Sequence, residues 1–234
     1  MAGREAAARR PQHFPGSYAP TALVLFSKMQ TNVYVDGFNL YYGSIRKTPY
    51  KWLNLERLCE LLLPRNEIHR VRYFTALVQD SPDDRTKSQR QQTFIRALET
   101  LPTVSVHYGS FLSSRVRMPL ATPQGWQRTA EVIKTEEKGS DVNLASLLLA
   151  DAFRGDFEVA AVMSNDSDLV LPIQIVTKEL RLPVGLLNPH PKFSVELSKV
   201  ATFKRSIRKG PLAASQFPDV LRDARGEIRK PAGW

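Results

Sequence analysis

Cysteine is nearly absent from this chain of 234 residues, in which Cys59 is the one thiol. A single cysteine forms no internal disulfide, and this is typical of proteins from a reducing compartment, so we expect a cytoplasmic protein. Cys59 lies among Leu58, Leu61 and Leu62. A nucleophilic cysteine needs a base nearby, and we therefore interpret Cys59 as a small core residue rather than a catalytic one.

Histidine and long apolar runs are also scarce. The chain has four histidines, and no His or Cys residues stand at the spacing of zinc ligands, which argues against a zinc site. No apolar run approaches the ~20 residues that span a bilayer, so we expect no membrane partner. The apolar stretch at 21–26 is shorter than the ~7–15 residues of a secretory signal, and no A-x-A cleavage motif follows it.

Acidic residues are few at the two ends of the chain, which carries a net charge of +10. Residues 1–28 have four basic residues against one acidic, residues 199–234 have nine against three, and the middle is nearly balanced. We interpret 1–29 as a disordered or weakly ordered basic N-terminal tail and 206–234 as a basic C-terminal tail. Such tails either attract a polyanion by counterion release or are merely solvated, and composition leaves both open.

Strand and helix patterns alternate between these tails, within a domain at 30–205. Strands are expected at 32–35, 69–78, 104–112, 157–163 and 182–187, with extended chain at 128–135. Helices are expected at 38–46, 55–63, 83–98, 140–153, 166–179 and 194–201, and a loop at 113–127. This alternation predicts an α/β fold with a mainly parallel central sheet and helices on both faces.

Aspartates stand where such a sheet binds ligands, at the carboxyl ends of its strands. Asp36 ends the first expected strand, Asp166 and Asp168 follow the strand at 157–163, and Asp141 opens a helix that would lie beside them. Four carboxylates together need a counter-charge, and hard oxygen ligands suit Mg²⁺ or Mn²⁺. Such ions would support phosphodiester hydrolysis with 5′-phosphate and 3′-hydroxyl products.

Each aspartate also has a purely structural explanation. Asp36 precedes Gly37, and Asp-Gly favours a turn. Asp141 would favour the positive end of its helix, Asp166 would serve as an N-cap, and Asp168 as an acid in the first helical turn. These explanations do not exclude metal binding, and they do not explain why the acids gather at one sheet edge.

Three segments containing these acids resemble the signature segments of NYN domains, in the LabA/DUF88 branch of the PIN-like nuclease superfamily. They are Val33-Tyr-Val-Asp36-Gly-Phe-Asn39-Leu, Glu137-Lys-Gly-Ser-Asp141-Val and Met163-Ser164-Asn-Asp166-Ser-Asp168-Leu. The resemblance covers roughly residues 30–205 and implies a PIN-like three-layer α/β/α sandwich with metal-dependent endoribonuclease activity. In the third segment Asn165 replaces a common glycine, and asparagine tolerates the left-handed backbone of such a turn.

The resemblance also implies roles for individual residues. Asp36, Asp141, Asp166 and Asp168 would be catalytic residues and the ligands of Mg²⁺ or Mn²⁺. Asn39 would position a water or the substrate phosphate, and Ser164 would support the acidic pocket through hydrogen bonds. Glu137 would be an accessory acid, and Lys138 would meet a phosphate.

Contacts with the substrate are expected from aromatic and basic residues. Phe38, Tyr41 and Tyr42 follow the first acid and either stack on bases or belong to the core. The arginines of the expected loop and its flank would grip a nucleic-acid backbone, or they simply make that loop polar. These arginines are Arg115, Arg117 and Arg128. The family implies RNA as the partner, single-stranded in preference to duplex, and homo-oligomerisation is left open.

The acidic pattern is compatible in part with three other classes of protein. A phosphatase of the haloacid dehalogenase type needs a nucleophilic aspartate two residues before Asp36, where this chain has Tyr34. A receiver domain places its phosphorylated aspartate on a later strand. The serious rival is a non-catalytic RNA-binding or regulatory module that keeps the acidic pocket.

Overall fold

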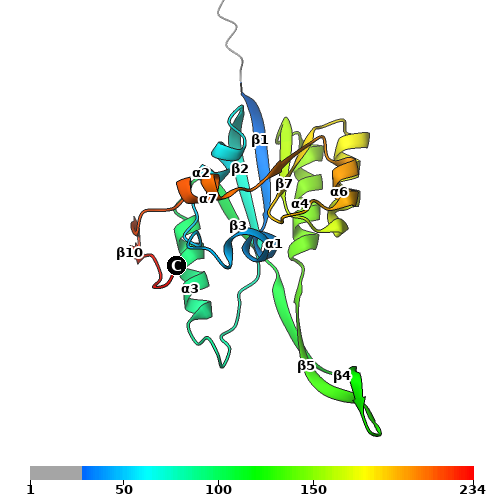
Figure 1. The fold of residues 1–234 in the computed structure, drawn as a ribbon. Helices are drawn as coiled ribbons and strands as arrows, with labels where there is room; N and C mark the ends of the chain where they lie inside the picture. The colour runs from blue at the N-terminus through cyan, green and yellow to red at the C-terminus, as the bar shows by residue number, and fades with distance from the viewer. Residues whose placement is uncertain (1–27) are drawn as a thin grey trace, which may run out of the picture.

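Six parallel strands form the central sheet in the computed structural model, which describes residues 28–234 (Figure 1). They are β1 (Met29–Asp36), β2 (Asn66–Thr75), β3 (Val104–Tyr108), β6 (Val159–Met163), β7 (Val184–Asn188) and β8 (Phe203–Ser206). The strand order is β3-β2-β1-β6-β7-β8, and every neighbouring pair is parallel. The expected tail at 1–29 falls outside the described residues except for its last two positions, and Met29 already begins β1.

Side chains of β1 alternate between two cores, which explains its apolar run Val33-Tyr34-Val35. Val33 and Val35 are fully buried in one core, and Tyr34, which lies between them, is fully buried in the other. In β6, Ala161 and Met163 join the first core, while Ala160 and Val162 join the second. A sheet covered on both faces needs apolar residues at every position of its central strands.

Helices supply the two outer layers. On the face of Val33, the core includes residues from α1 (Gly37–Leu40), η1 (Tyr41–Ile45), α2 (Leu55–Leu62), α3 (Lys87–Leu98) and α7 (Lys209–Ala214). On the face of Tyr34 it includes residues from α4 (Ser140–Arg154), α5 (Val170–Gln174) and α6 (Val195–Val200). This arrangement is the expected three-layer α/β/α sandwich.

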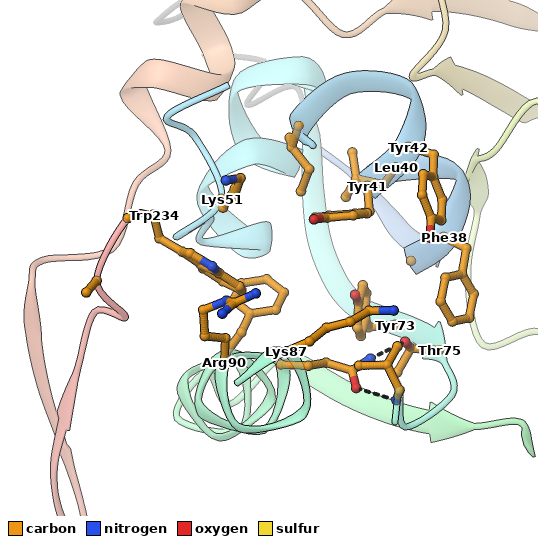
Figure 2. Close-up of a pocket in the computed structure, with 17 residues that line it drawn as sticks. Phe38, Leu40, Tyr41, Tyr42, Lys51, Tyr73, Thr75, Lys87, Arg90 and Trp234 are labelled. Carbon is orange, nitrogen blue, oxygen red and sulfur yellow. Dashed lines mark hydrogen bonds between the residues drawn. The ribbon is translucent and has the colours of Figure 1, made fainter. Parts of the chain in front are cut away.

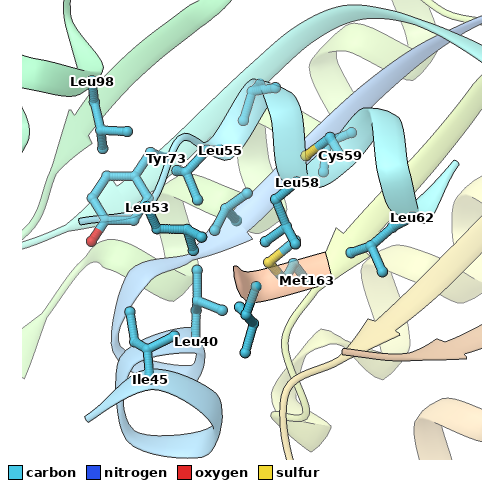
Figure 3. Packing of buried hydrophobic residues seen from close by; sticks show 14 of the residues in the cluster. Leu40, Ile45, Leu53, Leu55, Leu58, Cys59, Leu62, Tyr73, Leu98 and Met163 are labelled. Atoms are coloured by element: carbon cyan, nitrogen blue, oxygen red, sulfur yellow. The ribbon is translucent and has the colours of Figure 1, made fainter. Parts of the chain in front are cut away.

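The first core is built around α2, whose apolar residues recur on one side of the helix (Figure 3). Leu55, Leu58 and Cys59 are completely buried there, and Leu62 is nearly so. The Cys59 thiol therefore packs as a small apolar group, and burial raises its pKa, so that the reactive thiolate is disfavoured. The interpretation of Cys59 as a core residue is consistent with this setting.

The prediction of a loop at 113–127 was wrong, because this stretch belongs to a long antiparallel hairpin. Its strands are β4 (Ser110–Gln124) and β5 (Gln127–Lys138), and they project from the sandwich (Figure 1). Gly125 turns the chain with a φ of 58°. The arginine, serine and proline residues of this stretch concealed its strands. A hairpin that projects from the domain buries little of either face, so its strands need no alternation of apolar and polar residues.

The C-terminal segment 206–234 is folded against the sandwich and is not an extended tail. After α7 it forms a small antiparallel pair, β9 (Val220–Asp223) and β10 (Gly226–Arg229). Phe217 and Ile228 are buried in the first core, and Asp223 accepts two hydrogen bonds from Arg96 of α3. Its basic composition concealed these apolar anchors.

Other local differences from the expected elements include the following. The helix expected at 166–179 is divided into a 3₁₀ turn η2 (Ser167–Leu169), α5 and a π-helical turn η3 (Ile175–Glu179). The short edge strand β8 was not predicted, because four residues give too little pattern. No helix within residues 28–234 is long and apolar enough to cross a bilayer.

Candidate functional site

The order of strands reverses between β1 and β6, and the candidate site lies at this point. From β1 the chain moves outward to β2 and β3, and from β6 it moves the other way to β7 and β8. Open α/β sheets bind ligands outside the carboxyl ends of strands at such a reversal, because the connections leave a crevice there. Asp36 ends β1 and Ser164 directly follows β6, so both lie at the strand reversal, where such a crevice is expected.

Asp36 is held rigidly by three hydrogen bonds. Its Oδ1 accepts from the backbone amide of Asn39 at 2.9 Å, so the carboxylate also caps α1. Its Oδ2 accepts from Asn39 Nδ2 at 2.8 Å and from Ser164 Oγ at 2.9 Å. Asp36 is only 4% exposed, and its pKa is raised by burial despite these hydrogen bonds. The helix starts directly at Gly37, so this is no simple Asp-Gly turn.

The segment after β6 brings two further carboxylates to the crevice. Ser164 Oγ accepts from the backbone amide of Asp166 at 3.1 Å while it donates to Asp36, so it links the two strand ends. Asp166 Oδ1 accepts from the backbone amide of Asp168 at 3.0 Å and caps η2. Asp168 is exposed, whereas Asp166 is partly buried. The structure therefore supports the N-cap role of Asp166 and leaves its second oxygen without a hydrogen bond from the described residues.

Asp141 enters from the first turn of α4. Gly139, with a φ of 95°, redirects the chain from β5 into this helix, and Glu137 Oε1 accepts from the Ser140 amide at 3.0 Å. The Asp141 side chain accepts no hydrogen bond from residues 28–234. Gly109 allows the hairpin to pass close by, since a Cβ there would lie 2.3 Å from Glu137 Oε1.

The electrostatics show that these acids form one cluster. Burial and, in decreasing order, the charges of Asp36, Asp166, Glu137 and Asp168 together raise the pKa of Asp141 to about 6. Within the described chain, none of these five acids has a Lys, Arg or His nitrogen within 4.0 Å. The sequence-predicted aspartates are thus brought together, with no protein cation to neutralise them.

The donor set fits a hard divalent cation in its chemistry. All candidate ligands are carboxylate oxygens, and their mutual repulsion would be relieved by Mg²⁺ or Mn²⁺. In residues 28–234, however, no three His, Cys, Asp or Glu side chains are arranged around a single point as a complete metal site. Asp36 is fixed by its hydrogen bonds, whereas Asp141 and Asp168 are free of such restraints, so binding an ion requires these side chains to turn inward.

His190 belongs to the site and was missed by sequence reasoning. Asn39 Oδ1 accepts from the Asn165 amide at 3.2 Å and lies 3.0 Å from His190 Nε2. Because an amide oxygen only accepts, His190 Nε2 carries the proton in this contact. Gly43 packs against the imidazole, where a Cβ would lie 2.9 Å from Nε2. His190 follows β7, and its position after a strand end is the one signal in the sequence that could have identified it.

Asn165 fits the turn that links these groups. Its side-chain oxygen accepts from the Ser194 amide at 2.7 Å, and its Nδ2 donates to the Lys192 carbonyl at 3.2 Å. Among residues 28–234, Arg181 is the one non-glycine residue with a positive φ, so Asn165 does not need the left-handed backbone. The replacement of glycine thus adds hydrogen bonds instead of strain.

The predicted basic contacts are placed on or beside the hairpin. Lys138 lies 3.5 Å from Glu136 in an ion pair, and Arg115, Arg117 and Arg128 are exposed. Arg115 and Arg117 share the hairpin face of Phe111 and Glu137, which meets the site at the hairpin base. Arg128 lies on the opposite face, because side chains alternate along a strand and its neighbour Thr129 pairs with Pro119.

The aromatic candidates have mixed settings. Phe38 packs edge-on against Phe111 with ring centroids 5.8 Å apart, which joins α1 to the hairpin. Tyr41 is partly buried against the first core, and Tyr42 is 55% exposed with Arg46 over its ring. Tyr42 is therefore the most accessible ring of the three.

Comparison with known proteins found a matching family model, a protein of similar sequence and a solved structure of similar fold. The family model of the NYN domain matches residues 30–206. The 6-hydroxy-3-succinoylpyridine 3-monooxygenase HspA of Pseudomonas putida is 30% identical over 237 residues, covering 88% of this chain and 75% of HspA. A crystal structure of a protein of unknown function from Vibrio parahaemolyticus superposes with a TM-score of 0.52 at 17% identity, over 78% of this chain and 94% of that one. The last similarity speaks for the fold alone.

Proposed function

The chain belongs to the NYN domain family, and on that premise we propose that it is a divalent-metal-dependent endoribonuclease. The family is nuclease-like, and RNA, the metal and a cytoplasmic location are parts of this proposal. The observation that carries it is the gathering of Asp36, Asp141, Asp166 and Asp168 at the strand reversal, with no basic partner among the residues that the structure describes. Structural acids are normally paired, whereas unneutralised acids in a crevice are typical of sites that bind a cation.

Residues of the chain have distinct roles in this proposal. When bound, Mg²⁺ or Mn²⁺ supplies the positive charge that offsets the phosphodiester in its transition state. Asp36, Asp141, Asp166 and Asp168 would hold it. Asn39 and Ser164 fix the orientation of Asp36, and His190 fixes Asn39 in turn. Arg115 and Arg117 would hold the RNA backbone on the hairpin face that meets the site.

Cleavage of labelled single-stranded RNA tests the proposal. Wild-type protein should cleave with Mn²⁺ or Mg²⁺, stop on addition of EDTA, and leave 5′-phosphate and 3′-hydroxyl ends. Asp36→Asn and Asp168→Asn should lose cleavage. Asp219→Asn is the matched control, because Asp219 is 83% exposed and lies outside the site.

The outcomes separate the nuclease from its rivals. Cleavage by Asp168→Asn at the wild-type rate would mean a contaminating nuclease, and 2′,3′-cyclic phosphate ends would rule out this chemistry. RNA binding without cleavage, at the same affinity in wild type and Asp219→Asn, would instead favour the non-catalytic RNA-binding module. Homo-oligomerisation stays a prediction that sedimentation equilibrium would test.

A second candidate function comes from the relative named as a monooxygenase of 6-hydroxy-3-succinoylpyridine. A specific observation favours a small aromatic substrate, namely an aromatic-lined pocket that begins at Gly37, next to Asp36. O₂ uptake on addition of 6-hydroxy-3-succinoylpyridine and a reduced nicotinamide would support this candidate. Uptake unchanged by the pyridine, together with metal-dependent RNA cleavage, would eliminate it.

A further inference from the structure

A pocket of about 330 Å³ lies beside the acidic cluster, between α1, η1, α3 and the C-terminal residues (Figure 2). This volume is within the range of small-molecule sites, ~300–1,000 Å³. Six aromatic rings contribute to its wall: Phe38, Tyr41, Tyr42, Tyr73, Phe94 and Trp234. Three of them, Tyr73, Phe94 and Trp234, contact one another in series, with centroids 6.2 Å and 5.8 Å apart. These three rings pack edge-on or tilted against one another, so they give the pocket an aromatic wall.

The pocket is joined to the acidic cluster by the backbone that follows Asp36. Gly37 and Phe38 belong to both the first helical turn after Asp36 and the pocket wall. A Cβ at Gly37 would lie 2.7 Å from Tyr73 Cζ and 2.7 Å from the Phe74 carbonyl oxygen. The glycine therefore lets the Tyr73 ring lie directly beneath the start of α1, and a ligand in the pocket would be a close neighbour of the crevice.

The charged side chains of the pocket wall are all basic. Its wall contains Lys51, Lys87 and Arg90, and it contains no aspartate or glutamate. Arg90 is engaged by Asp84 and Thr86, but within residues 28–234 Lys51 and Lys87 have no carboxylate within 4.0 Å. Figure 2 shows the Lys87 side chain reaching towards Tyr73 and Thr75. A cation that lies partly buried among rings without a counter-charge is placed to meet an anion.

We propose that this pocket binds a planar aromatic ring that carries an anionic group. The ring would stack on or against the aromatic wall, and the anion would accept hydrogen bonds from Lys87 and Lys51. A nucleotide has this chemistry, and so does an aromatic carboxylate. The proposal does not depend on the proposed nuclease activity. In the nuclease, a nucleotide bound in this pocket would be the one next to the phosphodiester bond that is cut.

Calorimetric titration of the full chain in EDTA tests binding without any metal. The probes are uridine 5′-monophosphate and 6-hydroxypyridine-3-carboxylate, with uridine as the ring lacking an anion and ribose 5-phosphate as the anion lacking an aromatic ring. We expect at least one aromatic anion to bind with a Kd below ~1 mM. Uridine and ribose 5-phosphate should each bind ~10-fold more weakly or worse. The better of the two aromatic anions identifies the source of the ligand.

Variants locate the binding in the pocket. Lys87→Ala should weaken the aromatic anion ~10-fold, and Lys87→Gln should do the same while keeping the length of the side chain. Tyr41→Leu should weaken uridine 5′-monophosphate and uridine alike, because it removes a ring but no charge. Lys178→Ala is the matched control, because Lys178 lies in η3 and outside the pocket wall, and it should bind like wild type.

Three results would overturn the proposal: no binding of either aromatic anion, equal binding of ribose 5-phosphate, or unchanged binding by both Lys87 variants. Asp168→Asn should retain the affinity of wild type, because Asp168 is not part of the pocket. Wild-type protein that binds an aromatic anion but does not cleave RNA would therefore count against the nuclease alone, and wild-type protein that cleaves RNA but binds neither anion would count against the pocket alone.

Discussion

Two groups of aspartates around the central sheet have opposite surroundings. Asp151, 1% exposed, accepts hydrogen bonds from Arg72 at 2.7 and 2.9 Å and from the Tyr34 hydroxyl at 2.8 Å. Asp156 pairs with Arg70, and hydrogen bonds from Arg70 and Asn32 lower its pKa although partial burial opposes this. The acids of the crevice have no arginine or lysine partner among residues 28–234, and the pKa values of Asp36 and Asp141 are raised.

This difference distinguishes carboxylates that stabilise the fold by pairing with basic side chains from carboxylates that are available to bind a ligand. A paired buried carboxylate is satisfied within the protein, and removing it leaves an arginine without its partner. An unpaired carboxylate cluster destabilises the folded state until a cation joins it.

The largest effect is expected on catalysis. Asp168→Asn keeps the shape of an exposed side chain but removes a charge from the cluster, so RNA cleavage with Mn²⁺ should fall ~1,000-fold, which corresponds to about 4 kcal/mol. Single-turnover rates with labelled RNA measure this. The same variant should unfold in urea within ~0.5 kcal/mol of wild type, and a large loss of stability would place Asp168 in the structural group instead.

The next effect is on stability. Asp151→Asn leaves the Arg72 guanidinium, whose side chain is 14% exposed, without its carboxylate. The free energy of unfolding should fall by about 3 kcal/mol, as for other broken buried pairs. Urea denaturation followed by circular dichroism measures it, and a change below that of Asp168→Asn would erase the distinction between the two groups.

A smaller effect is expected from pH. The pKa of Asp141 rises from 3.8 to about 6 in the folded protein, so the folded state holds a proton that the unfolded chain releases. Metal-free stability should therefore fall as pH rises from about 4 to about 6 and level off above that window. Asp141→Asn should flatten this slope and gain roughly 1 kcal/mol at neutral pH, after discounting for partial exposure. A steeper slope in the variant would contradict this.

The smallest effects concern the hairpin. Arg115→Ala and Arg117→Ala should each reduce the slope of log affinity for single-stranded RNA against log salt by ~1. Arg128→Ala, on the opposite hairpin face, should change it less. Filter binding at several salt concentrations measures these slopes, and an equal change in all three variants would show that the hairpin face does not matter.

The sequence allowed the sheet and the acidic crevice to be predicted because both depend on local patterns. Strand β6 is apolar throughout, and its end fixes the place of Ser164 and Asp166 without knowledge of the rest of the fold. The hairpin strands could not be predicted in this way. Their positions depend on cross-strand pairs such as Val116 with Val132, and the two members of each pair lie too far apart in the sequence to belong to one local pattern.

Long-range contacts also explain what was missed around the site. His190 is 151 residues from Asn39, and only the pairing of β6 with β7 brings it there. Trp234 and Phe94 come together because Asp223 anchors the C-terminal segment to Arg96. A basic composition concealed that segment, whose few buried residues decide its position.

Calorimetric titration with Mn²⁺ tests the central claim that the unpaired acids share a cation. The metal-free wild type and Asp219→Asn should bind Mn²⁺ with the same affinity, while Asp36→Asn, Asp141→Asn and Asp168→Asn should each bind ~10-fold more weakly or not at all. Equal binding by wild type and the three crevice variants, or no binding by the wild type, would contradict the claim.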